Sequence, residues 1–239
     1  AIPHLAEKFP TYSEFALASL EEIYSPPALQ GALRLEANTL QSTVFRNDGN
    51  GRFTAEALPL MGQVSPGFGS AVEDFDGDGF LDLLIGQNFY HPQRETGRMN
   101  SGFGVLMKGD GKGGFSAVPP GASGVFLRVD ARSVAAGDLD GDGDPDVLYA
   151  ANEGHLRVLE NHAGGGGSVV LRSAPPGTKV TGRTSHDRKV VREAAAGSGY
   201  LSQGGAALRL PLRDGEELVE AEVRWPDGRT GPLPVPAAE

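Results

Sequence analysis

Two aspartate-rich segments with one shared spacing constrain the fold of this chain more than any other feature. Both follow the pattern Asp-x-Asp-x-Asp-Gly-x-x-Asp, over residues 74–82 and 138–146. Each leads directly into a short apolar run, at 83–85 and 147–149, and the glycines between the aspartates favour tight turns. No helical periodicity precedes either segment, so the pattern predicts loops that connect short β-strands.

The aspartate segments belong to a longer internal repeat. Residues 45–53 resemble residues 107–115, and the phenylalanines that end these stretches, Phe53 and Phe115, are 62 positions apart. Asp74 and Asp138 are 64 positions apart, which gives two copies of one repeat. Each copy contains a Gly-rich hairpin turn, a variable stretch, an aspartate loop and an apolar strand. Because four short strands per copy are typical of a propeller blade, the repeat predicts a mainly β fold with about two blades.

The sequences that flank the repeats differ from them. Residues 12–24 carry apolar side chains at helical spacing and residues 28–37 resemble a second short helix, so we expect a helical insert and the first blade edge over 1–44. The two repeats occupy 45–163. After a flexible Gly-rich break at 164–167, alternating segments predict a small, separate β domain over 164–239. Its strands are expected at residues 168–172, 189–191, 207–210 and 219–225.

The aspartates are spaced as ligands for a hard cation. Alternating carboxylates in a tight loop repel one another unless a cation neutralises them, and calcium prefers about six to eight oxygen ligands. The residue at position seven of each loop is expected to contribute its backbone carbonyl. An EF-hand is excluded, because its bidentate Glu at position twelve is replaced by Ile85 and Tyr149. The predicted ligands of two Ca²⁺ sites are Asp74, Asp76, Asp78, Phe80 and Asp82 in the first loop, and Asp138, Asp140, Asp142, Asp144 and Asp146 in the second.

Charge and composition exclude several classes of protein. The formal net charge is −10, and residues 1–163 carry 22 acidic against 11 basic side chains, which argues against a nucleic-acid partner. RNA binding would have to use the nearly neutral tail, where Arg183, Arg188, Lys189 and Arg192 lie. The lack of cysteine excludes disulfides, thiolate zinc sites and a cysteine nucleophile. No run of 18 apolar residues exists, so no membrane span is predicted.

These motifs resemble those of a known family. The sequence Asp-x-Asp-Gly-Asp-Gly-x-x-Asp with a following apolar strand is similar to the FG-GAP/VCBS repeat of integrin-type β-propellers, over roughly residues 41–160. The tail resembles an ASPIC/UnbV domain through residues 197–203 and 223–229, and the helical opening is similar to an insert of bacterial members. The resemblance implies a partial propeller, because two blades cannot close. We therefore expect the C-terminal portion of a longer chain, or open edges covered by the remaining blades or by another chain.

The two predicted calcium loops favour a non-catalytic extracellular module for binding, adhesion or protein interaction. Calcium outside cells fills weak sites, which predicts a secreted, periplasmic or cell-surface protein. Its ligand would be a protein or a carbohydrate, and the long loop at 88–100 is either a structural connection or a ligand-facing one. The alternative is a polysaccharide lyase or hydrolase on the propeller scaffold, with an acid/base pair outside the calcium loops. The candidates for that pair are Glu73, Glu95, Glu153, His91 and His155.

Overall fold

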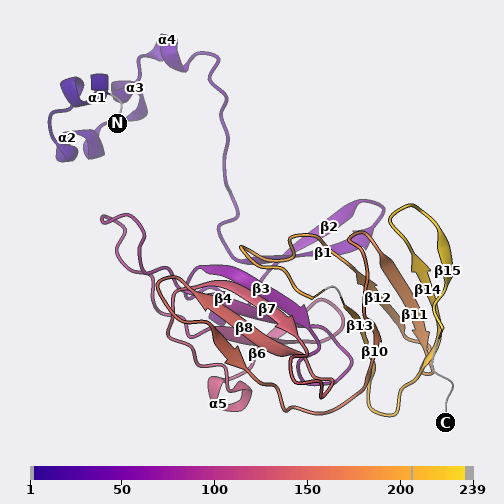
Figure 1. The fold of residues 1–239 in the computed structure, drawn as a ribbon. Helices are drawn as coiled ribbons and strands as arrows, with labels where there is room; N and C mark the ends of the chain where they lie inside the picture. Colours follow the sequence, from indigo (N-terminus) through magenta and orange to yellow (C-terminus); the bar gives the residue numbers. More distant parts are fainter. Residues whose placement is uncertain (1–2, 206, 235–239) are drawn as a thin grey trace. The chain divides into compact units, whose positions relative to one another are not determined.

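The computed structural model describes residues 3–205 and 207–234, and Figure 1 shows its ribbon. The chain divides into two compact units, Ala1–Leu40 and Gln41–Glu239. In the described residues, the first unit is helical and the second contains the strands together with the short helices η1 (Leu60–Gly62) and α5 (Pro120–Ser123). Across this described part of the chain, no helix has the length and apolar character needed to cross a membrane.

The first unit is built from very short helices. They are α1 (Pro3–Lys8), α2 (Tyr12–Leu17), α3 (Leu20–Ile23) and α4 (Pro26–Leu29). The single helix expected over 12–24 is wrong, because Ala18 is extended and Ser19 starts a new helix with a capping box to Glu22. The helix expected over 28–37 is also wrong. It stops at Leu29, and Gly31 then adopts a φ of 84°, outside the helical range.

A four-stranded antiparallel sheet forms one complete blade. Its strands are β3 (Gly67–Glu73), β4 (Asp82–Gln87), β5 (Val105–Gly109) and β6 (Phe115–Ala117), hydrogen-bonded in that order. Strand β4 is buried along its whole length, as expected for an apolar strand with a core on both faces. Leu83 and Ile85 join one apolar cluster and Leu84 joins another, so successive side chains of β4 face opposite sides of the sheet.

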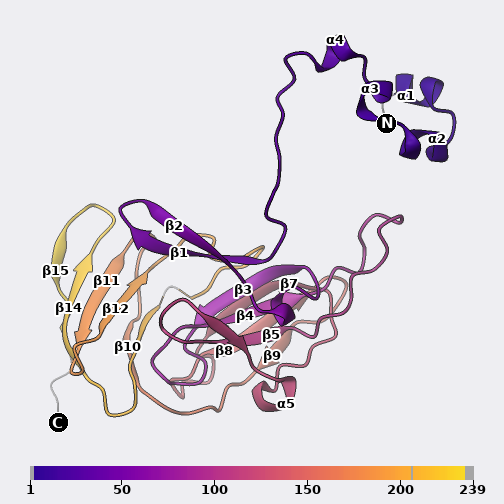
Figure 2. The ribbon, with the colours of Figure 1, turned by 180° about the vertical axis from the view of Figure 1, so that it is seen from behind.

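The second aspartate loop belongs to a neighbouring three-stranded sheet. Its strands are β7 (Ala131–Gly137), β8 (Asp146–Ala151) and β9 (Arg157–Leu159), again in chain order. Strands β3 and β7 lie side by side in both views of the ribbon (Figures 1 and 2). Gly69 permits this approach, because a Cβ there would lie 2.6 Å from the backbone nitrogen of Val134. Phe75, Leu84 and Tyr149 are among the buried side chains of the cluster that the two sheets share.

The boundaries of the repeat differ from those expected. Strands β1 (Thr43–Gly49) and β2 (Arg52–Ala57) form a two-stranded sheet, and they correspond in sequence to β5 and β6. A blade therefore begins with the strand before the aspartate loop and ends with the Gly-rich hairpin, whereas the sequence analysis placed the hairpin first. The described residues contain two-, four- and three-stranded propeller sheets and no closed barrel. The mainly β fold with a partial propeller is confirmed.

The C-terminal domain has two further sheets around one core. Its strands are β10 (Ser168–Leu171), β11 (Lys179–Thr184), β12 (Lys189–Glu193), β13 (Leu208–Pro211), β14 (Leu218–Arg224) and β15 (Thr230–Pro232). One sheet has the order β12-β11-β14-β15, and the other pairs β10 with β13. Val180, Leu210 and Val223 are almost fully buried in the core that the two sheets share. Strands occur at all four expected places, and β11 and β15 are additional strands that were not expected from the sequence.

The Gly-rich linker at 164–167 is a packed contact, and the expectation of a flexible break is wrong. The N–H of Gly166 donates to the carbonyl oxygen of Gly77 in the first aspartate loop, at 2.7 Å. A Cβ on Gly166 would collide with the carbonyl oxygen of Leu212, so the close approach of three backbone segments requires glycine there. The C-terminal domain consequently packs on this loop and belongs to the same compact unit as the repeats, rather than standing apart from them.

Candidate metal centre

The first aspartate loop connects β3 to β4 at one end of the complete blade. Its backbone folds around Asp74, whose carboxylate accepts hydrogen bonds from the N–H groups of Asp78 (3.1 Å) and Gly79 (2.8 Å). Gly77 and Gly79 have φ angles of 69° and 84°, in the left-handed region that glycine enters without steric cost. These turns bring carboxylate oxygens of Asp74, Asp76 and Asp78 within 4.8 Å of one another. Alternating acidic side chains therefore share one small volume, as their spacing predicts.

The second aspartate loop repeats this construction between β7 and β8. The carboxylate of Asp138 accepts a hydrogen bond from the N–H of Gly141, at 2.7 Å. Gly141 and Gly143 again have positive φ angles, of 87° and 100°. The carboxylate oxygens that gather within 4.8 Å belong here to Asp138, Asp140 and Asp146. The two loops thus differ in which positions converge, although both place acidic oxygens around one point.

The remaining predicted ligands take part in local hydrogen bonds. Asp142 accepts from the N–H of Asp144 at 2.9 Å, and Asp144 accepts from the N–H of Gly164 at 3.0 Å. Phe80 donates its own N–H to Asp78, at 2.9 Å. The bonds of Asp142 and Phe80 lie within their turns, whereas the bond of Asp144 joins the second loop to the linker. That the carbonyls of Phe80 and Asp144 bind a cation stays a prediction.

The aspartates at position nine, Asp82 and Asp146, have a structural role that the spacing alone does not reveal. Only 1% and 0% of their surfaces are exposed. Asp82 accepts from the N–H groups of Phe75 (3.0 Å) and Gly109 (2.9 Å). Asp146 makes the matching pair of bonds, because it accepts from the N–H groups of Leu139 (2.7 Å) and Asn161 (2.9 Å). Each carboxylate ties its loop to the end of the third strand, and each oxygen keeps a lone pair for a cation.

Burial and mutual repulsion disfavour the charged form of the carboxyl groups in the first loop. Desolvation by burial, together with the charges of Asp76, Asp78 and Asp82, raises the pKa of Asp74 from its ordinary value of 3.8 to about 6. Desolvation also raises the pKa of Asp82. These carboxyl groups therefore lie where an added positive charge would stabilise them.

In the described part of the chain, a basic side chain lies beside the carboxylates of each loop, and neither was predicted from the sequence. The ammonium of Lys108, in β5, contacts Asp76 and lies 2.8 Å from Asp78. Hydrogen bonds to these two carboxylates raise the pKa of the Lys108 ammonium. Arg209, in β13, lies 3.2 Å from Asp138. Burial alone would raise the pKa of Asp138, but hydrogen bonds from backbone N–H groups and from Arg209 lower it.

The donor set fits a hard divalent cation. The acidic side chains that converge in the two loops offer carboxylate oxygens, and oxygen is the ligand type that calcium prefers. The ammonium of Lys108 lies between two carboxylates of the first loop and acts there as a stand-in cation. The loop therefore has both the charge and the room for a positively charged group.

Comparison with protein families identifies both parts of the second unit. The FG-GAP-like repeat matches residues 35–85 and 97–149, and the FG-GAP repeat matches residues 131–171. The family described as ASPIC and UnbV matches residues 172–238. The chain is an FG-GAP repeat protein with a C-terminal ASPIC and UnbV domain. A search of curated proteins gives no individual match. The FG-GAP repeats supply the two aspartate loops, and the ASPIC and UnbV domain supplies Arg209.

The acid/base candidates lie outside the aspartate loops of the FG-GAP repeats. Glu73 pairs with Arg192 at 2.6 Å. Nε2 of His91 lies 3.8 Å from a carboxylate oxygen of Glu153, and these side chains are 52% and 74% exposed. Glu95 and His155 are exposed as well. Of the five candidates, the structure brings together His91 and Glu153, in a contact that solvent weakens.

The long loop of the FG-GAP repeat at 88–100 has a folded base and an exposed tip. A β-bridge joins Phe89 to Met99, and the guanidinium of Arg98 lies 4.9 Å from the ring centroid of Tyr90. Residues 93–98 are exposed. The loop extends from the end of β4 before the chain returns to β5 (Figure 2). A ligand-facing role for this loop stays a prediction.

Proposed function

We propose that this chain is a calcium-stabilised β-propeller module that acts in binding, adhesion or protein interaction and has no catalytic activity. The observation that carries the proposal is the convergence of carboxylates in two loops of the same construction, in neighbouring sheets. Calcium, when bound, supplies the charge that neutralises these carboxylates. The residues that would hold two Ca²⁺ ions are Asp74, Asp76, Asp78, Asp82 and the carbonyl of Phe80, and Asp138, Asp140, Asp142, Asp146 and the carbonyl of Asp144.

The loops suit calcium better than magnesium. Magnesium demands rigid octahedral geometry and retains several of its waters, whereas calcium accepts more ligands at variable angles. Each loop offers several carboxylates from a turn rather than from a rigid sheet. Asp82 and Asp146 would hold the ends of the loops in place while the alternating carboxylates close on the ion.

The proposal includes a location outside the cytosol, which is secreted, periplasmic or at the cell surface. Weak calcium sites are filled there, because extracellular modules bind calcium with dissociation constants of about 10⁻⁴ to 10⁻³ M. Large apolar side chains on the outer sheets support a partner that covers them. Phe45 and Phe53 are 65% and 60% exposed on the β1–β2 sheet, and Val158 of β9 is 49% exposed. Further blades or another chain would bury these edges.

The positions of the acid/base candidates support a non-catalytic role, and the proposed ligand is a protein or a carbohydrate. Glu73 is held by Arg192, and the His91–Glu153 contact is open to solvent. That contact is the one observation in favour of the alternative, a polysaccharide lyase or hydrolase. Turnover of any member of a polysaccharide panel, lost in Glu153→Gln, would replace the proposed function with this alternative.

Thermal unfolding with and without calcium tests the proposed function. Calcium at about 100 times its dissociation constant stabilises a folded protein by about 2.7 kcal/mol per site, which predicts a rise in Tm of several degrees. The rise should disappear in the double variant Asp76→Asn and Asp140→Asn. It should persist in a matched control, Asp187→Asn and Asp214→Asn, which removes two exposed acids outside the loops. Equal melting curves of the unaltered protein in calcium and in chelator would contradict the proposal.

A further inference from the structure

The carbonyl oxygens at position six of the two aspartate loops each accept a hydrogen bond from an arginine of the C-terminal domain. Nη1 of Arg188 donates to the oxygen of Gly79 at 2.7 Å, and Nη1 of Arg209 donates to the oxygen of Gly143 at 2.7 Å. Arg188 precedes β12 and Arg209 lies in β13. Because the arginines come from unrelated places, the equivalence is a property of the loops, which present the same atom to the same domain.

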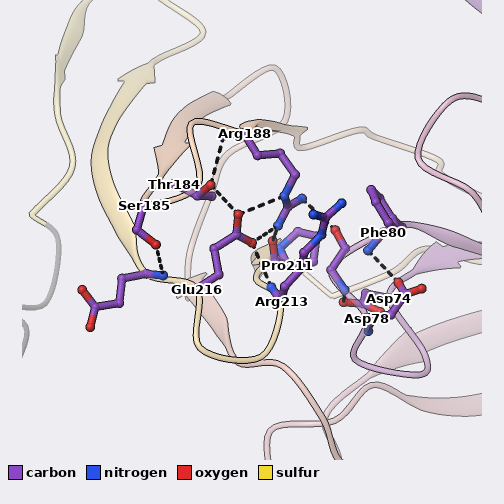
Figure 3. A network of polar contacts seen from close by, with 11 residues as sticks. Asp74, Asp78, Phe80, Thr184, Ser185, Arg188, Pro211, Arg213 and Glu216 are labelled. Atoms are coloured by element: carbon purple, nitrogen blue, oxygen red, sulfur yellow. Dashed lines mark hydrogen bonds and ion pairs between the residues drawn. The ribbon is translucent and has the colours of Figure 1, made fainter.

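Arg188 is fixed in its orientation by a buried network, which Figure 3 shows. Its guanidinium pairs with the carboxylate of Glu216, which has 0% of its side chain exposed, and donates to the oxygen of Pro211 at 2.9 Å. Glu216 also accepts from the hydroxyl of Thr184 and from the N–H of Arg213. A buried pair with this many hydrogen bonds holds the guanidinium in one position. One N–H group is thereby directed at the loop.

The same domain and its linker make further contacts with the first loop. The guanidinium of Arg213 lies 4.5 Å from the ring centroid of Phe80. A Cβ on Gly79 would lie 2.7 Å from the side chain of Arg213, so the loop and the domain are in direct van der Waals contact. Gly166 donates to the carbonyl of Gly77. The backbone of the loop is therefore in contact with the linker at Gly77 and with the C-terminal domain at Gly79.

We propose that the ASPIC and UnbV domain docks on the aspartate loops in their cation-binding conformation, so that calcium binding and domain docking strengthen each other. The inference rests on the proposed binding of calcium. The turn that directs the carbonyl of Gly79 at Arg188 is the turn that gathers the carboxylates of Asp74 and Asp78. One cannot change without the other. By thermodynamic linkage, a cation that stabilises this turn must favour docking, and docking must favour the cation by the same factor.

The first loop is where this coupling can be measured cleanly. Arg188 contacts a carbonyl of the loop and forms its ion pair with Glu216, so it does not compete with calcium for a loop carboxylate. Arg209, in contrast, contacts both the carbonyl of Gly143 and the carboxylate of Asp138. Docking at the second loop therefore fixes the turn, which favours calcium binding. It also neutralises the charge of one predicted ligand, Asp138, which disfavours calcium binding.

Amide hydrogen exchange of the whole chain, in calcium and in chelator, tests the coupling. Calcium should slow exchange in both loops and also in the segments that contact them, at 164–167, 188–192 and 208–216. The exposed turn at 226–229 is the internal reference and should not change. Calorimetric titration of calcium accompanies the exchange experiment. If calcium binds with measurable heat but slows exchange only in the loops, the coupling is overturned and the proposed function stays intact. No binding heat and no protection would overturn both.

The reciprocal arm measures calcium binding after the arginine contact is removed. The double variant Arg188→Met and Glu216→Gln removes both charges of the buried pair. The amide oxygen of Gln keeps an acceptor for the N–H of Arg213, and the amide NH2 can donate to the hydroxyl of Thr184. Its matched control, Arg183→Met and Glu220→Gln, removes an exposed pair of the same domain with 2.8 Å between its atoms. The first variant should bind calcium at one site about fivefold more weakly or worse, and the control should not. Equal affinities in two folded variants would overturn the proposal; if the first variant fails to fold, the exchange experiment decides.

Discussion

The ammonium nitrogen of Lys108 lies 2.8 Å from a carboxylate oxygen of Asp78, inside the first aspartate loop, and the same ammonium contacts Asp76. In the register of the second sheet, the equivalent position is occupied by Glu160. The first loop thus carries its own cation, whereas the second has an additional acid in that place. If calcium binds as proposed, it would have to displace Lys108 to reach two of its predicted ligands in the first loop.

We expect Lys108→Met to strengthen calcium binding at the first site and to destabilise the calcium-free protein. Exposed ion pairs are worth about 0.2–1 kcal/mol, which corresponds to about 1.4-fold to fivefold in affinity. Calorimetric titration and melting in chelator measure the two effects. Lys112→Met, at the exposed hairpin between β5 and β6, is the matched control. Weaker calcium binding in Lys108→Met would show that the lysine supports the site instead of competing for it.

The anchoring role of Asp82 predicts a loss of stability that does not depend on calcium. Asp82→Ala leaves the buried N–H groups of Phe75 and Gly109 without their acceptor, which costs about 2–4 kcal/mol in the free energy of unfolding. Asp82→Asn keeps one carbonyl oxygen and should cost less. Urea unfolding in chelator measures both, with Asp214→Ala, at an exposed turn outside the loops, as a control near zero. If Asp82→Ala is as stable in chelator as the unaltered protein, Asp82 serves as a ligand only.

The buried pair of Glu216 and Arg188 predicts a pH dependence of stability. Burial would raise the pKa of Glu216, but hydrogen bonds from Arg188, Arg213 and Thr184 lower it from 4.5 to about 2. Because the pKa is lower in the folded state, the stabilisation is complete above pH 4.5 and is lost as the pH falls toward 2. The difference in unfolding free energy between the unaltered protein and Glu216→Gln should therefore shrink across this range. For the exposed neighbour, Glu217→Gln, a change of similar size would show that the effect is not specific to the pair.

Two neighbouring glycines of the linker, Gly166 and Gly167, allow close packing to be distinguished from backbone flexibility as the reason for glycine. A Cβ on Gly166 would collide with the carbonyl of Leu212 and lie 2.6 Å from that of Gly77, whereas a Cβ on Gly167 meets nothing within 4 Å. We expect Gly166→Ala to lower the free energy of unfolding by about 1–3 kcal/mol and Gly167→Ala to change it by less than about 0.5 kcal/mol. Chemical denaturation measures both. Equal effects of the two substitutions would return the linker to the role of a flexible break.

Features that depend on neighbours in the sequence could be predicted from it. The turns of the aspartate loops follow from Asp and Gly at fixed offsets, and the buried strands after them follow from uninterrupted apolar runs. The limits of the repeat did not follow. The hairpin sequence at 45–53 looks the same whether it opens or closes a blade, and only the pairing of β4 with β5 decides. At 12–24, the apolar residues have helical spacing, but the cap at Ser19 starts a second helix and divides the segment in two.

Contacts between distant residues were beyond the reach of the sequence analysis. Arg188 and Gly79 are 109 positions apart, and Arg209 and Gly143 are 66 apart, so no motif links them. The glycines at 164–167 show the same limit, because a composition that is typical of flexible linkers also permits the closest backbone packing. The part of the site that is local was predicted, and the part that the C-terminal domain contributes required the structure.

Titration of calcium into chelator-treated protein, followed by calorimetry, tests the central claim most directly. We predict binding heat from two sites in the unaltered chain and the loss of both in the double variant Asp76→Ala and Asp140→Ala. Circular dichroism of that variant in chelator confirms that it is folded. No heat, or the same heat in the double variant, would show that the two aspartate loops are turns without a metal and would contradict the account.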